Sequence, residues 1–303
     1  MRVAERGVAI VLAMGVVAMA AMAATAIMIT QSTWSRATEL TADHVQGQLL
    51  IQAGADWARA LLAYDRRSNN VDHLGEPWAM RLPAMPVENG ELTGYIEDQH
   101  SHFNVNNIVK DGKLNVAQYE IFKRLLAILK LPPALADTLV DWVDADNETQ
   151  PQGAEDAYYL ALDPPYLAAN RPLLDVDELA LVSGFNENVR ARLRPFVTAL
   201  PRFTAVNPNT ATPEVLAAVI DGLGLDGARN MVARRERAYF RSFEDFYKQL
   251  PRGLNVPSEN ITVSSDYFVA TLRVTMGGAQ ARGTALLART TDFWPAIVWT
   301  KTQ

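Results

Sequence analysis

Residues 7–29, GVAIVLAMGVVAMAAMAATAIMI, decide how this 303-residue chain is organised. The stretch contains no charged residue and follows a short leader that carries Arg2, Glu5 and Arg6. About 20 apolar residues in a helix span the ~30 Å hydrocarbon core of a membrane. A positive segment before such a helix stays on the cytoplasmic side, so the remainder of the chain crosses the membrane. The sequence therefore predicts one membrane-spanning segment at residues 8–29.

The local pattern leaves three interpretations of this segment open. Ala21-Met22-Ala23 has the small residues of a signal-peptide cleavage site, and cleavage there gives a mature protein that starts near Ala24. The second interpretation is an uncleaved single-span anchor. The third is a prepilin-type segment, which is cut directly after Gly7 and keeps its apolar helix. Arg6 and Gly7 stand immediately before the apolar run, and this arrangement favours the third interpretation.

Residues 31–67 contain no proline and extend the helical pattern beyond the membrane segment. Apolar residues recur there at helical spacing, at Leu40, Val45, Leu49, Leu50, Ala53, Trp57, Ala60, Leu61 and Tyr64. The pattern predicts one long helix, apolar in its first half and amphipathic in its second half. Such a helix is typical of a pilin subunit, and a membrane anchor followed by a stalk helix is the alternative.

Strand patterns lie on both sides of a helical region. Alternating or β-branched residues predict strands at 91–98, 261–263, 267–276 and 279–289, with turns at Asn89-Gly90 and Gly277-Gly278. Helical periodicity predicts helices at 116–130, 133–143 and 213–220. We therefore expect an α+β protein in which the long helix covers a small antiparallel sheet. The apolar tail at 290–303 has no assigned role.

Two asparagine-rich turns suggest an internal repeat within the helical region. Asn104, Asn106 and Asn107 precede the first predicted helices, and Asn207 and Asn209 precede the helix at 213–220. Asparagine side chains accept hydrogen bonds from the free N–H groups at a helix start. We expect these residues to cap two helical modules built on one plan.

An acidic loop is the strongest local signal for a bound ion. Asp144, Asp146, Glu148 and Glu155 occupy positions 1, 3, 5 and 12 of a helix–loop–helix calcium site. Carboxylate oxygens suit Ca²⁺, which prefers hard ligands. Thr149 replaces the usual turn glycine, so we expect a calcium loop of another geometry, with Asp141 and Asp156 as further ligands. A solvated acidic loop without an ion is the alternative.

Other patterns point to no enzyme. The four histidines, His44, His73, His100 and His102, have no catalytic or metal-binding partners by spacing. The chain has no cysteine, which excludes thiol chemistry, and its net charge of −6 argues against nucleic acid as the main partner. The turn at Gly222-Leu223-Gly224, followed by four arginines, resembles a helix–hairpin–helix that presents N–H groups to phosphates. Close packing of two helices is the alternative reason for these glycines.

The chain resembles the K class of minor pseudopilins of type II secretion systems (general secretion pathway protein K). The resemblance covers essentially the whole chain. It rests on Arg6-Gly7-Val8-Ala9 with the apolar run, on Glu97-Asp98 leading to residues 103–107, on residues 141–146, on Gly153-Ala-Glu-Asp-Ala-Tyr-Tyr-Leu-Ala-Leu-Asp-Pro-Pro-Tyr166, on residues 170–173 and 176–179, and on residues 206–211.

The resemblance implies how the N-terminus is processed and where the subunit acts. Prepilin peptidase would cut between Gly7 and Val8, and the new N-terminus would be methylated. The fifth mature position is Leu12, where most pilin-like proteins carry Glu and the K class carries an apolar residue. The mature protein would be a single-pass inner-membrane protein with a periplasmic domain. It would join minor pseudopilins I, J and H as a pseudopilus tip that helps export folded proteins.

The resemblance also implies a domain division and a calcium site. Residues 1–7 form the leader, 8–29 the membrane half of the helix, and 30–105 the pilin-like part. Residues 106–200 form a large inserted all-helical domain of the SAM-like or helix–hairpin–helix-like type, and 201–303 a second helical module with the C-terminal sheet. The inserted domain would bind one or two Ca²⁺ ions through Asp144, Asp146, Glu148, Glu155 and Asp156.

Two other classes of protein remain as alternatives. The first is a membrane-anchored DNA-binding protein of the competence type, which would use the hairpin at residues 222–224. The second is a soluble periplasmic binding domain released by a signal peptidase.

Overall fold

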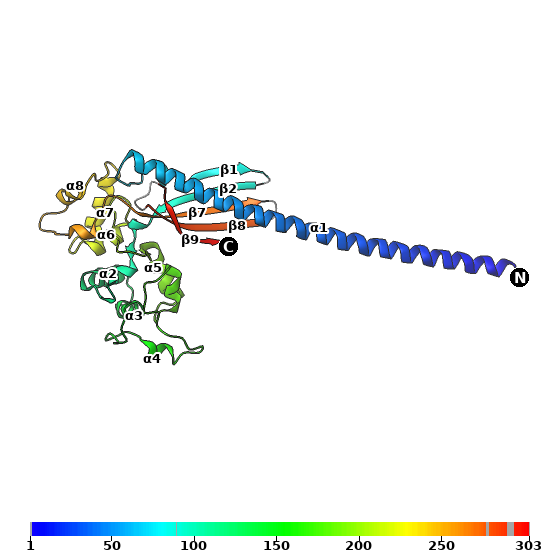
Figure 1. Cartoon of the computed structure of the whole chain (residues 1–303), viewed down its shortest axis with the longest axis horizontal. Helices are drawn as coiled ribbons and strands as arrows, with labels where there is room; N and C mark the ends of the chain where they lie inside the picture. Colours follow the sequence, from blue (N-terminus) through cyan, green and yellow to red (C-terminus); the bar gives the residue numbers. More distant parts are fainter. Residues whose placement is uncertain (1, 89, 277–278, 290–293, 303) are drawn as a thin grey trace.

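The computed structural model describes residues 2–88, 90–276, 279–289 and 294–302. Its longest element is helix α1 (Arg2–Ser68), which extends far beyond the folded body towards the N-terminus (Figure 1). Residues 10–42 of α1 are exposed. An 18-residue window within Ile10–Ser68 has a mean hydropathy of 2.4, so α1 is long and apolar enough to cross a membrane. The prediction of one continuous helix is confirmed.

The C-terminal half of α1 lies against a five-stranded sheet of order β1-β2-β7-β8-β9 (Figure 1). Every neighbouring pair in this sheet is antiparallel. The strands are β1 (Leu82–Val87), β2 (Gly90–Asp98), β7 (Tyr267–Met276), β8 (Ala279–Ala288) and β9 (Ala296–Thr302). The predicted α+β class, with a long helix on an antiparallel sheet, is confirmed. Asn89, Gly277, Gly278 and residues 290–293 lie outside the described residues, so the turns predicted there are not described.

Two strands of the sheet were not predicted from the sequence, and one predicted strand was wrong. β1 contains Pro83 and Pro86 and lies at an edge, where a strand tolerates proline because one side needs no N–H donors. β9, formed by the apolar tail, is the other edge. Residues 261–263 form no strand, since Ile261 makes only an isolated bridge to Val206.

Small residues bring α1 close to the sheet. Ile51, Ala55, Ala58 and Leu62 recur every three or four positions and are buried in the same core as the sheet residues. A Cβ on Gly54 would lie 2.9 Å from Leu272 Cδ2, and a Cβ on Gly283 would lie 2.1 Å from Ile51 Cγ2. Larger residues at either glycine would push the helix and the sheet apart.

The chain between β2 and β7, which we call the insertion or inserted domain, includes both the predicted inserted domain (106–200) and the helices of the predicted second module. Its helices are α2 (Val116–Ile128), α3 (Ala134–Val143), α4 (Asp156–Tyr159), α5 (Glu187–Leu193), α6 (Pro213–Val219), α7 (Gly224–Arg235) and α8 (Phe243–Lys248). Short strands pair as β3 (Phe103–Asn104) with β6 (Val197–Thr198), and as β4 (Val109–Lys110) with β5 (Lys113–Leu114). The prediction that residues 106–200 are all-helical was therefore wrong, because β4, β5 and β6 lie within them. Short 3-10 helices lie at Pro77–Ala79, Gln99–Ser101, Val105–Ile108, Val176–Leu181, Arg194–Phe196 and Ser258–Asn260. One cluster of buried apolar residues runs from Phe103 to Ile261.

Most of the asparagines have a different role from the predicted one, although the Asn104 side chain does cap the 3-10 helix Val105–Ile108 by accepting from the Asn106 N–H. The side chains that cap α2 and α6 are those of Asn115 and Thr212. Asn106 and Asn107 instead donate to backbone carbonyls of distant loops, at Leu173, Leu200 and Thr204. They satisfy buried loop backbone, which has no regular secondary structure to pair with.

A buried arginine joins α1, the sheet and the insertion. The Arg289 guanidinium contacts Asp65 Oδ2 at 3.0 Å, and it also pairs with Asp72. These three side chains are at most 7% exposed. Ser265 donates its N–H to Asp72 and its hydroxyl to Asp98, at the end of β2. Burial, followed by the charges of Glu76 and Asp72, raises the pKa of Asp65 to about 7.

Removing the positive charge from this group should strongly destabilise the fold. Arg289→Met leaves two buried carboxylates without a cation, and breaking a buried ion pair on one side costs about 3–5 kcal/mol. Urea unfolding of the full chain in detergent measures the change. The control is Arg252→Met at an exposed arginine. A loss below about 1 kcal/mol for Arg289→Met would show that the ion pairs are dispensable.

Candidate metal centre

The acidic loop follows directly from helix α3. Every residue of α3 from Leu135 to Val143 is buried, and the helix ends at Val143, directly before Asp144, whose backbone is extended. The chain then forms a loop that ends at Glu155, the residue before α4. The loop is therefore anchored by the buried helix α3 at one end and by the buried Tyr159 of α4 at the other, and each end contributes one acidic residue.

The structure brings three of the predicted ligands together. Asp144, Asp146 and Glu155 each offer a carboxylate oxygen, and these oxygens all lie within 4.8 Å of one another. Asp144 and Glu155 are each only 3% exposed, whereas Asp146 is exposed. Asp144 Oδ1 and both carboxylate oxygens of Glu155 are buried without a hydrogen-bond partner in the part of the chain that the structure describes. Orphaned buried oxygens of this kind fit a hard divalent cation.

The pKa values of Asp144 and Glu155 also show that no positive charge balances these two buried carboxylates. Burial, and then the charges of Asp146 and Asp141, raise the pKa of Asp144 to about 6. Burial, and then the charges of the neighbouring aspartates, raise the pKa of Glu155 to about 7. A bound cation would favour the charged forms of both groups and reverse these shifts.

Two further carboxylates on α3 shape the loop. Asp141 accepts a hydrogen bond from the Gln150 N–H at 3.1 Å, and Asp137 accepts one from the Gln152 N–H at 3.0 Å. A Cβ on Gly153 would lie 1.8 Å from Asp141 Oδ2, so glycine is required for this close approach. The two carboxylates hold the loop backbone and leave the ligand oxygens free.

The other predicted ligands, Asp141, Glu148 and Asp156, are not part of the group of three. Glu148 is exposed, and its N–H donates to Asp146 Oδ1 at 2.9 Å. Asp156 Oδ1 accepts a hydrogen bond from the Ala168 N–H at 3.0 Å, which ties α4 to the following loop. The full ligand set stays a prediction.

A second acidic group was not foreseen from the sequence. Asp65, Asp72 and Glu76 are buried and also bring their oxygens within 4.8 Å of one another. Arg289 already supplies a cation there, and Glu76 accepts hydrogen bonds from the Trp78 ring N–H and the His73 N–H. This group is therefore a structural ion-pair network. No local motif marks it, because Arg289 is 224 residues from Asp65.

The remaining candidate residues have structural partners. His100 lies between the Ala205 carbonyl and the Asp266 N–H, and His102 Nδ1 lies 2.8 Å from Ser101 Oγ. Gly222 and Gly224 both have positive φ, as the turn between α6 and α7 requires.

Two arginines that follow this turn also have partners within the chain. Arg235 donates to the carbonyls of Pro208 and Ala211, and Arg229 pairs with Asp226.

The residues predicted for N-terminal processing lie at the start of α1. Leu12 is exposed on α1, and the backbone of Gly7 and Val8 also lies in this helix.

Comparisons with known proteins agree on one family. Models of type II secretion system protein K match residues 101–202 and 206–264. The chain is 36% identical to type II secretion system protein K of Pseudomonas aeruginosa, over 91% of this chain and 86% of that protein. It is 34% identical to the Aeromonas hydrophila protein of the same name, with coverage of 85% and 84%. The fold is similar to a chain of the GspK-GspI-GspJ complex from enterotoxigenic Escherichia coli, with a TM-score of 0.73, 20% identity, and coverage of 88% of this chain and 99% of that chain.

Calcium should stabilise the protein more strongly at high pH than at low pH. Because the folded pKa values of Asp144 and Glu155 are raised to about 6 and about 7, the folded protein without a cation binds more protons than the unfolded chain between about pH 4 and pH 7. Its free energy of unfolding therefore falls as the pH rises through this window. Calcium competes with these protons, so we expect calcium to raise the melting temperature more at about pH 8 than at about pH 5.

Thermal melts with calcium or with EDTA at both pH values measure this difference. Asp144→Asn should remove most of the shift, whereas Glu148→Gln should keep it. Equal melting temperatures with calcium and with EDTA at high pH would exclude the site.

Proposed function

The chain belongs to the type II secretion system protein K family and is a minor pseudopilin of that system, and from this premise we propose that it forms the tip of a periplasmic pseudopilus. In this role it helps to initiate and cap the fibre that exports folded proteins across the outer membrane. The proposed role is structural rather than enzymatic.

The observation that carries the proposal is the division of α1 into two halves. Residues 10–42 of α1 are exposed, and those up to residue 29 are apolar, whereas the C-terminal half packs on the sheet. A helix of this kind can leave the bilayer with its globular domain attached and pack beside the helices of other subunits. Leu12 supports a tip position, because an unpaired carboxylate in hydrocarbon is costly and leucine is not.

We propose inner-membrane insertion before assembly, with the N-terminus cytoplasmic and the sheet and insertion periplasmic. The basic leader supports this orientation. Cleavage between Gly7 and Val8 by prepilin peptidase and methylation of the new N-terminus complete the proposal.

The proposed partners are minor pseudopilins I, J and H. The Escherichia coli protein of similar fold was solved as a GspK-GspI-GspJ complex, which supports I and J. The proposal for H rests on the family resemblance alone.

The proposed cofactor is Ca²⁺, held by Asp144, Asp146 and Glu155, with Glu148 and Asp156 as nearby acidic groups. The orphaned buried oxygens of Asp144 and Glu155 support it. When bound, the ion supplies the positive charge that this part of the chain lacks and ties the end of α3 to the start of α4. The SAM-like or helix–hairpin–helix-like character of residues 106–200 is also part of the proposal and rests on the family resemblance.

The DNA-binding alternative receives no support from the comparisons. The engagement of Arg235 and Arg229 with groups of the same chain also leaves fewer charges for phosphates.

Processing should depend on Gly7. In cells that contain prepilin peptidase, we expect the membrane-extracted protein to start at Val8 with one added methyl group. Gly7→Leu should leave the full-length precursor, whereas Gly15→Leu, with no atom within 4 Å of its Cβ position, should be processed normally. Intact mass and N-terminal sequencing measure both outcomes. A start near Ala24 would instead show a signal peptide and overturn the proposal.

Assembly should require other minor pseudopilins. Coexpressed with pseudopilins I and J of the same secretion system, the full chain should elute with both from a size-exclusion column in detergent. Because the exposed face of α1 is the expected contact, Trp34→Glu should abolish this coelution, whereas Tyr247→Glu on α8 should not. Separate elution of the three wild-type proteins would argue against a tip complex.

A further inference from the structure

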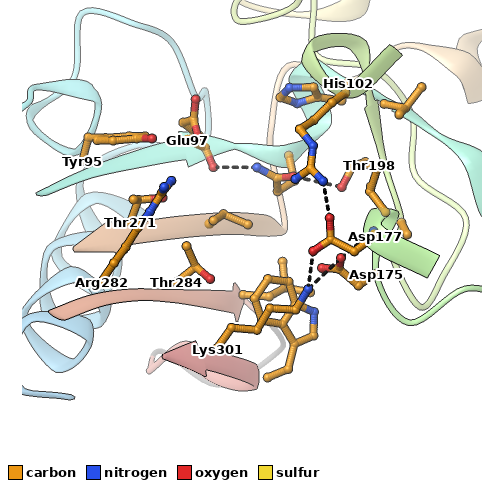
Figure 2. A pocket seen from close by; sticks show the side chains of 18 residues that line it. Tyr95, Glu97, His102, Asp175, Asp177, Thr198, Thr271, Arg282, Thr284 and Lys301 are labelled. Carbon is orange, nitrogen blue, oxygen red and sulfur yellow. Dashed lines mark hydrogen bonds and ion pairs between the residues drawn. The ribbon is translucent and has the colours of Figure 1, made fainter. Parts of the chain in front are cut away.

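A cleft with a cavity volume of about 470 Å³ separates the sheet from the inserted domain (Figure 2). Its floor is the face of the sheet turned away from α1. Side chains alternate between the two faces of a strand, and Leu272 and Gly283 face α1. Thr271 and Arg273 on β7, and Arg282 and Thr284 on β8, therefore point to the opposite side.

Ion pairs close the cleft on the side of β9 (Figure 2). Lys301 contacts Asp175 at 2.8 Å and Asp177 at 2.9 Å, and Arg194 also pairs with Asp177. Lys301 and Arg194 together lower the pKa of Asp177 to about 2. The charges in this group are matched, so the group holds the insertion to the sheet and offers no free charge to a ligand.

The floor of the cleft also carries unmatched positive charge. Arg282 lines the cleft and lies directly opposite Arg273 in the β7–β8 register. Both arginines are exposed, and neither forms an ion pair with any carboxylate among the described residues. Like charges placed directly opposite each other destabilise a sheet. An anion bound between them would remove this repulsion.

Two acidic residues of β2, Glu91 and Glu97, lie on the same face, and neither forms an ion pair with Arg273 or Arg282 among the described residues. Arg273 pairs in register with Thr93, and Glu97 lies four residues farther along β2. At about 3.4 Å per residue, Glu97 lies about 14 Å from Thr93 along the strand, and Glu91 lies about 7 Å from Thr93 in the other direction. Arg81 lies 5.0 Å from the centre of the Tyr95 ring, and its charge acts on Glu97, where it opposes the rise in pKa that burial causes.

Neutral hydrogen-bonding groups continue the floor. Thr271 and Thr284 face each other in the register, and their hydroxyls make no hydrogen bond within the ranges that the structure describes. Tyr95 and Trp299 contribute aromatic side chains to the lining. Paired hydroxyls between aromatic walls, with a basic site at one end, suit an extended backbone that carries acidic side chains.

We propose that this cleft binds an extended acidic segment of a partner protein, with Arg282 and Arg273 contacting its carboxylates and Thr271 and Thr284 its backbone. Because Arg273 and Arg282 have no ion-pair partner among the described residues, the segment that binds should be negatively charged. The hydroxyls of Thr271 and Thr284, which lie between aromatic side chains, favour a polypeptide over a small anion. The proposal does not depend on calcium or on N-terminal processing.

Binding of a model peptide to the full chain in detergent tests the proposal. The probe is fluorescein-labelled hexaglutamate, with labelled hexaglutamine as the uncharged comparison, and the readout is fluorescence anisotropy at low ionic strength, where charge contacts are least screened. We expect hexaglutamate to bind and hexaglutamine not to bind. Arg282→Glu should weaken binding by roughly tenfold or more, and Arg273→Glu should also weaken it.

Matched variants separate the cleft from the overall charge. Arg252→Glu makes the same charge change at an exposed arginine outside the lining and should leave binding unchanged. Arg282→Gln, with its melting temperature checked against the wild type, serves if Arg282→Glu folds poorly.

Four results would overturn the proposal. The first is unchanged hexaglutamate binding in the Arg282 variants, and the second is an equal loss in Arg252→Glu. The third is sulfate binding that depends on Arg282 and matches the peptide in affinity, because it would assign the site to a free small anion. The fourth is a wild-type dimer that Arg282→Glu dissociates, because it would assign the cleft to a second copy of this chain.

Discussion

The placement of the long helix depends on the buried contact of Arg289 with Asp65 and Asp72. Asp65 lies near the end of α1, Asp72 in the loop that follows, and Arg289 directly after β8. Ser265 and Asp98 extend the contact to the start of β7 and the end of β2, where the chain enters and leaves the insertion. Charges this deeply buried must be paired to be tolerated. The helix, the sheet and both connections to the insertion are therefore fixed at one point.

The two buried acidic groups differ in whether the chain itself supplies a cation, and this difference determines whether each group could bind an added metal ion. Around Arg289, the carboxylates are neutralised within the chain and serve the architecture. In the loop after α3, Asp144 and Glu155 are equally buried, but their orphaned oxygens have no counter-charge. Asp141 and Asp137 bind backbone N–H groups there, so they support the loop without neutralising it. Only the second group therefore suits an added ion.

The spacing of apolar residues in the sequence predicted those helices and strands that have one apolar face and one polar face. α1 and strands β2, β7 and β8 have clear apolar patterns, and the alternate spacing of Asp144 and Asp146 predicted their convergence with Glu155. β1 was missed because prolines interrupt its pattern, and β9 because its apolar residues do not alternate with polar ones. The caps of α2 and α6 were misassigned because asparagines equally serve to bind distant loops. The Arg289 network and the cleft could not be predicted, because both join residues far apart in the chain.

The long helix gives the molecule an unusual mechanical property. At 1.5 Å per residue, the exposed part of α1 from residue 10 to residue 42 is a rod of about 50 Å that is clamped at one end. By simple geometry, a tilt of about 5° at the clamp displaces the free end by roughly 4 Å, close to half the spacing of two packed helices. The close contacts at Gly54 and Gly283 set the angle between the helix and the sheet. A small change in the distance between helix and sheet at these contacts would therefore move the N-terminal end of α1 by about a helix radius.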